Sequence, residues 1–315
     1  MKKNATTLAI ALILCLFPAS DSSASDGFQP EKPFDVNQSS HSNQYSDAAV
    51  ARDVIYKTTN EKELTLDIYK PLVQVYQKSP AIVYIHGGAW VMGNKNGTDT
   101  KSLMPYFNIL RQNGYTIITI NYRLLSDGSA FPGPVSDCKD ALRWIVQNSD
   151  SYSIDSNNIG LWGVSSGASM ALLCAYSSDN EFKDEGSLSS QSTAVRYVID
   201  FSGPTSFEGY LKNTPAAFRK YVSAFSLDKK ISRSPTPLQY IKNTSPPTLI
   251  VHGKNDRIVP YYHSKNLYET ALSRGANAKY ILLSGADHTL SGASASDISM
   301  LSETIFDFID ENYQN

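Results

Sequence analysis

The chain has 315 residues, of which 41% are hydrophobic and 18% are charged, and its formal net charge is −2. This is long for one domain, but α/β folds often reach this size as a single unit, and the apolar fraction can fill a large core. The near-neutral charge, with no run of Lys or Arg, argues against a surface for nucleic acid or for an anionic membrane.

The N-terminus has the parts of a signal peptide. Lys2 and Lys3 precede the apolar run Leu8–Phe17, and Ser22-Ser23-Ala24 offers small residues at the cleavage positions. The apolar run is too short to span a bilayer comfortably. We therefore expect residues 1–24 to be removed during export, which leaves a periplasmic or secreted protein with no stable membrane insertion.

Residues 25–48 are rich in Ser, Asn, Gln and Asp and are expected to form an irregular tether. A single domain is expected from residue 49 to residue 315, and it opens with an alternating pair of segments, Arg52–Thr58 and Glu63–Tyr69, typical of a half-buried antiparallel pair. Apolar runs then predict strands at Ala81–Ile85, Tyr115–Asn121, Asn158–Trp162, Ala194–Phe201, Thr248–His252 and Lys279–Leu283. Helical patterns lie at Lys101–Gln112, Val135–Asn148, Ser166–Ser177, Tyr262–Arg274 and Ala295–Tyr313. This alternation predicts an α/β fold with a mostly parallel sheet and helices on both faces.

Two segments interrupt the alternation. Residues 177–193 are Ser-rich and acidic and are expected to form a surface loop. Residues 203–246 are rich in Pro, contain a helical stretch around Ala216–Phe225 and are much longer than an ordinary connection. Because ligands of α/β sheets bind at the carboxyl ends of the strands, we expect residues 203–246 to form a small lid or cap there.

One serine stands between two glycines at a predicted strand-to-helix junction, in Gly163-Val164-Ser165-Ser166-Gly167. Glycine is needed on both sides because a Cβ would clash with the facing backbone in so tight a turn. The turn exposes the Ser165 hydroxyl above the sheet and points the helix N-terminus at the group that it attacks. Ser165 is therefore the candidate nucleophile.

A nucleophilic serine needs a base, and the base needs an acid that orients it. His288 lies in a glycine-bearing loop after the last predicted strand, and Asp256 lies in the turn after the strand before it. The order Ser165, Asp256, His288 matches the chain order of α/β-hydrolase triads. These three residues are the predicted catalytic set.

Other residues compete for two of these roles. His252 ends a buried strand and is a weaker candidate for the base. Asp200 ends its own strand and competes for the acid, whereas Asp287 is adjacent to the base in sequence, where neighbouring side chains diverge.

The segment His86-Gly87-Gly88-Ala89-Trp90 predicts an oxyanion hole. Attack on a carbonyl creates an oxyanion that needs preorganised N–H donors, and backbone donors approach it closely only where side chains are absent. Gly87 and Gly88 are the expected donors, with Ala89 as a replacement for one of them. The N–H of Ser166, directly after the nucleophile, supplies the other half.

Taken together, these motifs resemble the α/β-hydrolase esterases with an HGG oxyanion motif, and within them the bifunctional feruloyl and acetyl-xylan esterases (BD-FAE). The resemblance covers about residues 50 to 312. It rests on His86–Trp90, Asn121-Tyr122-Arg123-Leu124, Phe131-Pro132, Asp137 with Asp140–Trp144, Gly163–Gly167, His252–Asp256 and Asp287-His288. It implies ester hydrolysis through an acyl-enzyme without a cofactor, with Tyr122 and Arg123 in structural roles. Ser166-Gly167-Ala168 departs from the family's usual Ser-Ala-Gly-Gly, but each change replaces one small residue with another.

The expected function is hydrolysis of short-acyl esters, small-molecule or carbohydrate, with deacetylation or deferuloylation of polysaccharide as one form of it. A serine peptidase and a formamidase-type amidase share the same triad and remain alternatives. A catalytically inactive hydrolase fold used for binding is a third, which the complete set of catalytic residues disfavours.

No metal is expected, because no Cys/His cluster has metal-ligand spacing, and the resemblance implies no cofactor. Cys15 would leave with the signal peptide, so Cys138 and Cys174 remain. Export permits a disulfide, but two buried free thiols are the preferred interpretation.

Overall fold

The computed structural model describes residues 50–59, 62–183, 190–207 and 234–314. Within these residues lies an eight-stranded sheet with the strand order β1-β2-β4-β3-β5-β6-β7-β8. The strands are β1 (Val50–Thr58), β2 (Glu63–Tyr69), β3 (Ser79–Ile85), β4 (Thr116–Ile120), β5 (Ile154–Val164), β6 (Tyr197–Phe201), β7 (Thr248–Gly253) and β8 (Ala278–Leu283). The helices are α2 (Thr98–Gln112), α3 (Gly133–Gln147), α4 (Ser166–Tyr176), α7 (Pro237–Tyr240), α8 (Tyr262–Ser273) and α9 (Ala295–Glu311), with 3₁₀ turns η3 (Leu125–Asp127) and η4 (Asp150–Tyr152).

The sheet is parallel from β4 to β8, and only β1 and β2 run antiparallel to their neighbours. Every residue of β3, β4, β6 and β7 is buried, which explains why these strands are continuous apolar runs rather than alternating ones. The carboxyl ends of β3, β5, β7 and β8 consequently lie along the same edge of the sheet, although the chain reaches them in separate segments.

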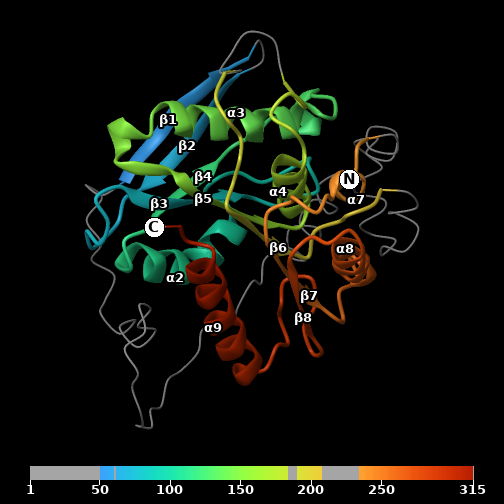
Figure 1. Ribbon diagram of the computed structural model, residues 1–315. Coiled ribbons are helices and arrows are strands. Elements are labelled where there is room, and N and C mark those ends of the chain that lie inside the picture. The colour runs from blue at the N-terminus through green and yellow to red at the C-terminus, as the bar shows by residue number, and fades with distance from the viewer. Residues whose placement is uncertain (1–49, 60–61, 184–189, 208–233, 315) are drawn as a thin grey trace, which may run out of the picture.

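Helices cover both faces of the sheet, as Figure 1 shows: α2 and α9 lie on one face, and α3, α4 and α8 on the other. The amphipathic patterns of α2, α3 and α9 turn their apolar sides to the sheet, whereas α4 is apolar and buried along nearly its whole length. On the α2 and α9 face, Leu103, Phe107, Ile305 and Ile309 pack in one buried cluster. The predicted mostly parallel α/β architecture is confirmed.

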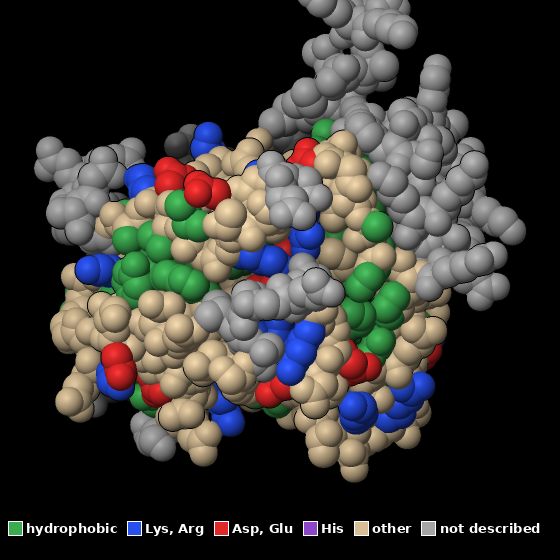
Figure 2. Space-filling model, turned by 90° about the horizontal axis from the view of Figure 1, so that it is seen from above, with side chains coloured by type: hydrophobic (Ala, Val, Ile, Leu, Met, Phe, Trp, Pro, Cys, Tyr) green, Lys and Arg blue, Asp and Glu red, His purple; other side chains and the backbone are tan. Residues whose placement is uncertain are grey.

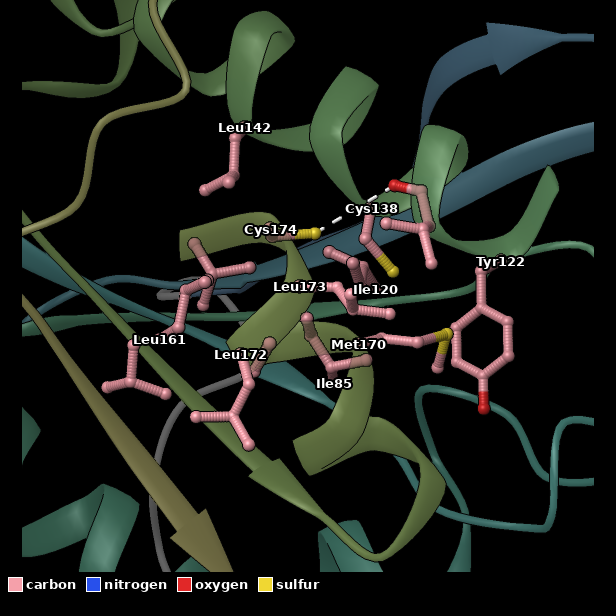
Figure 3. Packing of buried hydrophobic residues seen from close by; sticks show 14 of the residues in the cluster. Ile85, Ile120, Tyr122, Cys138, Leu142, Leu161, Met170, Leu172, Leu173 and Cys174 are labelled. Atoms are coloured by element: carbon pink, nitrogen blue, oxygen red, sulfur yellow. Dashed lines mark hydrogen bonds between the residues drawn. The ribbon is translucent and has the colours of Figure 1, made fainter. Parts of the chain in front are cut away.

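The layer between α3 and α4 holds the two cysteines of the described chain. Cys138 of α3 and Cys174 of α4 are buried and unbonded, and Figure 3 shows both among aliphatic side chains such as Leu142 and Leu173. The Cys174 thiol donates to the Val135 carbonyl over 3.8 Å. Burial raises the pKa of the Cys138 thiol, so it stays protonated and unreactive. The prediction of two free thiols is confirmed.

Several predictions lie outside the described residues. They are the signal peptide at 1–24, the tether at 25–48 and the helical stretch around Ala216–Phe225 in the expected lid. Of the lid segment 203–246, residues 203–207 and 234–246 are described, and α7 is one short helix there. Among the helices of the described chain, none combines the length and apolarity needed to cross a membrane.

On the face seen in Figure 2, Lys and Arg side chains alternate with Asp and Glu rather than gathering into one wide patch. The described residues on this face therefore do not form the wide patch of positive charge that would attract a polyanion.

Candidate active site

Ser165 occupies the sharp turn between β5 and α4. Its backbone is in a positive-φ conformation (φ 55°, ψ −124°), which non-glycine residues rarely adopt. A Cβ on Gly163 would lie 2.5 Å from the Ala168 backbone, and one on Gly167 would lie 2.1 Å from the Ile85 carbonyl oxygen. The two glycines therefore allow the backbone contacts that hold the strained serine, as the sequence predicted.

The structure brings Ser165, His288 and Asp256 into one hydrogen-bonded row. His288, in the loop between β8 and α9, places Nε2 3.0 Å from Ser165 Oγ, and its Nδ1–H donates to Asp256 Oδ2 over 2.6 Å. Asp256 follows β7 and its side chain is fully buried, whereas the His288 side chain is 11% exposed. This geometry leaves Nε2 as the acceptor for the Ser165 hydroxyl proton.

The Asp256 carboxylate accepts four hydrogen bonds. Oδ1 accepts from the N–H groups of Ile258 and Val259 at 2.7 and 2.8 Å, and Oδ2 faces His288 at 2.6 Å and His252 at 3.0 Å. Burial opposes its ionisation, but the positive charge of His288 and the donors on both imidazoles hold its pKa well below the usual range. Asp256 is therefore a carboxylate at neutral pH.

The same contact acts on His288 in the opposite sense. Burial disfavours the imidazolium, but the Asp256 carboxylate and its hydrogen bond outweigh burial and raise the pKa of His288 above its ordinary value of 6.5. Asp287, next to it in the loop, adds a smaller contribution in the same direction. The imidazole is thus a stronger base than a free histidine.

The competing candidates lie elsewhere. Asp200 is fully buried at the end of β6, and its Oδ1 accepts from the Gly203 N–H at 2.9 Å. Asp287 caps its own loop by accepting from the N–H of Thr289 and of Ser291. His252 contacts the acid, Asp256, and its other hydrogen-bond partners are Ser264 and Val259 rather than Ser165.

The loop after β3 departs from prediction at Gly87. The Gly87 N–H donates to the buried Asp99 Oδ2 over 2.7 Å, so it is directed away from any oxyanion. Within the part of the chain that the structure describes, the N–H groups of Gly88 and Ala89 have no acceptor. The prediction of Gly87 as a donor is therefore corrected to Ala89, the residue that the sequence offered as its replacement, with Gly88 retained.

Ser166 completes the set of donors. It is the first residue of α4, so its N–H has no partner within the helix. The N–H therefore remains available beside Ser165 at the positive end of the helix dipole.

The loop is held rigidly behind these donors. The Tyr122 hydroxyl donates to the His86 carbonyl at 2.9 Å, and the two rings stack with centroids 4.3 Å apart. Burial lowers the pKa of His86, and its Nδ1–H donates to the Gly87 carbonyl at 2.7 Å. Ala89 and Trp90 both have positive φ (53° and 61°), which is the turn that directs successive N–H groups to one side. The structural role expected for Tyr122 fits these contacts.

Arg123, the other residue expected to be structural, ties the loop after β4 to α3. Its guanidinium donates to both oxygens of Asp137, at 2.8 and 2.7 Å. Such a bidentate pair fixes the orientation of both side chains.

Aromatic side chains separate the oxyanion loop from an open cavity of about 660 Å³. The Trp90 ring packs edge-on against Phe131 and Phe207, with centroids 6.5 and 5.4 Å away. Phe131 also lines the cavity, together with Arg123, Gly128, Ser129, Ala130, Pro132, Gly133, Ser136, Asn180, Phe182 and Lys183.

Within the described residues, no group of three or more His, Cys, Asp or Glu side chains is arranged to hold a metal ion.

The parallel sheet, the strained serine at a strand-to-helix turn and its row to His288 and Asp256 define the α/β-hydrolase fold. The BD-FAE family model matches residues 66–271, and the chain belongs to this family.

Curated relatives include two esterases of Mycobacterium tuberculosis. LipQ is 25% identical over 270 residues, which are 83% of this chain and 62% of LipQ. LipC is 24% identical over 233 residues, which are 71% of this chain and 56% of LipC. The chain thus spans about three fifths of the length of these relatives.

Solved structures share the fold. A truncated carbohydrate esterase from gut microbiota has a TM-score of 0.67 and 23% identity, covering 84% of this chain and 95% of that one. The propionate-bound esterase Est2 of Thermogutta terrifontis has a TM-score of 0.68 and 22% identity, covering 84% of this chain and 94% of that one.

Proposed function

We propose that the protein is a serine carboxylesterase that hydrolyses short-acyl esters through an acyl-enzyme. The observation that carries this proposal is the 3.0 Å contact between Ser165 Oγ and His288 Nε2, with Asp256 behind the imidazole. A hydroxyl bonded to a base that a buried carboxylate orients is the arrangement that activates a serine for attack.

In the acylation step, Ser165 Oγ attacks the ester carbonyl while His288 Nε2 takes its proton. Asp256 holds the Nδ1–H tautomer and stabilises the imidazolium that forms. The tetrahedral oxyanion accepts from the N–H groups of Gly88, Ala89 and Ser166. His288 then protonates the leaving alcohol, and the carbonyl reforms on Ser165.

Deacylation repeats the same steps with water. His288 takes a proton from a water molecule that attacks the acyl-enzyme, and the oxyanion forms again in the same hole. The acid is released and Ser165 regains its proton. No step needs a metal or a cofactor.

Short acyl groups and a carbohydrate alcohol are the substrate class that we favour. Among the solved structures of the same fold, one is described as a carbohydrate esterase and Est2 is described with propionate and with butyrate bound. In this chain, the open cavity near the oxyanion loop combines the partly buried aromatic side chains of Phe131 and Phe182 with the polar side chains of Arg123, Ser129, Ser136, Asn180 and Lys183. Aromatic side chains beside polar groups suit sugar rings.

The test compares p-nitrophenyl acetate, butyrate and decanoate as substrates of the protein and of Ser165→Ala, and then acetylated xylan as a natural polymer. We expect rates that fall with acyl length and a loss of at least about 10³-fold in the variant. Equal rates for the protein and the variant on all three esters would remove the esterase proposal. Cleavage of a peptide or formamide substrate instead would favour one of the amidase alternatives.

We also propose export with removal of residues 1–24, which is supported by the Lys2-Lys3, apolar and small-residue pattern. Mass spectrometry of protein expressed with its full N-terminus tests it. A mature chain starting at Ser25 is expected, and an uncleaved chain retained in the cytoplasm would contradict it.

Residues 203–246 are proposed to form the lid. Phe207, at the start of this segment, packs against Trp90 of the oxyanion loop.

A further inference from the structure

A second histidine contacts the acid of the proposed triad from behind. His252, at the end of β7, is completely buried, and its Nε2 lies 3.0 Å from Asp256 Oδ2 and 2.8 Å from the Val259 carbonyl oxygen. Its Nδ1 lies 2.6 Å from the Oγ of Ser264, a fully buried residue in the first turn of α8. No part of this imidazole is available to a substrate.

These contacts define the tautomer of His252. A carboxylate oxygen and a carbonyl oxygen can only accept, so Nε2 carries the proton and shares it between Asp256 and Val259. On the other side of the ring, Nδ1 is hydrogen-bonded to the Ser264 hydroxyl. The hydrogen-bonded chain therefore runs from Ser264 through His252 to the same carboxylate oxygen that binds His288.

We propose that His252 is a positioning residue that holds the Asp256 carboxylate in register with His288 and sets how strongly that carboxylate binds the imidazolium. The proposal rests on the proposed function, because it assigns His252 a part in the same triad. The structure supports it through a shared atom: Oδ2 accepts from His288 Nδ1–H at 2.6 Å and from His252 Nε2–H at 3.0 Å.

Two donors on one oxygen compete for its electron density. When the His252 donor is removed, the negative charge of Oδ2 is committed to His288 alone, so the imidazolium becomes more stable. The other ionisable groups around this pair are Asp287, beside His288 in its loop, and His263, which precedes Ser264 in α8. Burial lowers the pKa of His263 to about 4, so it adds no charge at neutral pH.

The test uses two amides of different length. In His252→Gln, the amide nitrogen can reach Oδ2 as Nε2 does, whereas in His252→Asn the side chain is one methylene shorter and cannot. The titration of His288 is followed by NMR in the substrate-free protein, together with the downfield Nδ1–H proton that a short bond to a carboxylate produces. We expect His252→Asn to move the titration of His288 to higher pH and to change that proton signal, and His252→Gln to stay close to wild type.

His263→Gln is the matched control. It replaces another buried histidine in the first turn of the same helix, whose Nδ1 accepts from the Thr205 N–H, whereas His252 Nε2 contacts Asp256. We expect this variant to leave the titration of His288 unchanged. If His252→Asn does not fold, Ser264→Ala removes the partner of Nδ1 instead, and a smaller shift in the same direction is expected.

Catalysis gives the second readout. We expect kcat/KM of His252→Asn to fall about 10-fold or more. The acidic limb of its kcat/KM–pH profile should also move to higher pH. His252→Gln should recover most of the lost kcat/KM. A folded His252→Asn with the wild-type titration and the wild-type Nδ1–H signal would overturn the proposal. The NMR readout needs no substrate, so a failure of the esterase proposal is seen separately, as equal rates for wild type and Ser165→Ala.

Discussion

A buried carboxylate lies behind the oxyanion loop, at Asp99 in the first turn of α2. It accepts the Gly87 N–H at 2.7 Å, and the next two N–H groups of the loop have no acceptor among the described residues. A Cβ placed on Gly87 would lie 3.4 Å from Ser165 Cβ and 3.6 Å from Asp99 Oδ2, so this contact borders the nucleophile itself. Asp99 therefore directs the loop, although it touches no substrate.

Asp99→Ala tests this assignment. Without its acceptor, the Gly87 N–H is free to rotate and the donors at Gly88 and Ala89 lose their common direction, so we expect kcat to fall about 10- to 100-fold with little change in KM. Asp99→Asn keeps an oxygen for the Gly87 N–H and should retain most of the activity. Asp150→Ala, at an exposed aspartate in η4 that pairs with Lys78, is the control. Equal activity of Asp99→Ala and wild type would contradict the role.

His288 governs the pH dependence of the proposed reaction. Acylation needs its neutral form, and Asp256 raises its pKa above the ordinary 6.5. The acidic limb of a kcat/KM profile is thus expected to have its midpoint above pH 6.5, with activity lost as pH falls through it. A chromogenic acetate ester measured from pH 5 to pH 9 gives this midpoint, and a midpoint below 6.5 would mean that burial outweighs the carboxylate.

At the scale of the elements, α3 is a helix whose buried positions carry charge. Asp137, Asp140 and Arg143 are all at most 2% exposed. Lys57 of β1 donates to Asp137 at 2.8 Å and to Asp140 at 2.6 Å, and Arg143 donates to Asp140 at 2.7 Å. This network connects the antiparallel edge of the sheet to α3, and through the Arg123 pair it also reaches the loop that lines the 660 Å³ cavity.

Lys57→Met is expected to destabilise the fold by about 3 kcal/mol, because it leaves two buried carboxylates with one cation fewer. Denaturant unfolding followed by circular dichroism measures the change. Lys78→Met removes an ion pair whose two side chains are 54% and 86% exposed and should leave the unfolding midpoint unchanged. If both variants unfold at the wild-type midpoint, the network contributes nothing to stability.

Local patterns were sufficient to predict the strands and the long helices, but not the short α7, η3 and η4. A short stretch of sequence is enough to predict a buried strand from the continuous apolar runs at β3 and β7. It is also enough to predict a tight turn from the two glycines around Ser165. The strand order was not predictable in this way, because β2 lies beside β4 and β3 beside β5 through contacts between distant segments. The antiparallel edge at β1 was expected, but its charged connection to α3 depends on Lys57 reaching side chains 80 and 83 residues away.

The same distinction holds for the site. Ser165, Asp256 and His288 were found because their spacing and order follow the order of the strands that carry them. Asp99 was missed as a partner of Gly87, because an acidic residue in the first turn of a helix is ordinarily explained by the helix dipole. The sequence showed an acidic residue near the start of a helix, but it did not show that the Asp99 carboxylate faces the Gly87 N–H.

At the scale of the whole molecule, Asp200 makes stability depend on pH. Burial raises its pKa to about 7, which the Gly203 N–H only partly offsets, and among the described residues its Oδ2 has no hydrogen-bond partner. The folded state therefore binds one more proton than the unfolded chain between about pH 4 and pH 7, so this group's contribution to stability falls as pH rises through that window and is constant above it.

Asp200→Asn resembles the protonated acid and can still accept from the Gly203 N–H. Its Tm should match that of wild type near pH 4.5 and exceed it by several degrees at pH 8. Differential scanning fluorimetry of both proteins across this range measures the difference. A difference in Tm that is the same at all pH values would show that Asp200 ionises normally in the fold.

Trp90 gives the molecule its own optical signal at the site. Its indole is completely buried, directly follows the Ala89 donor and packs against Phe207 at the start of the proposed lid. Of the other two tryptophans, Trp162 lies on the opposite face of the sheet, and Trp144 of α3 packs against Tyr152 of η4. Emission from Trp90 therefore reports the surroundings of the oxyanion loop, so the proposed acylation can be timed by stopped-flow fluorescence with natural, colourless esters.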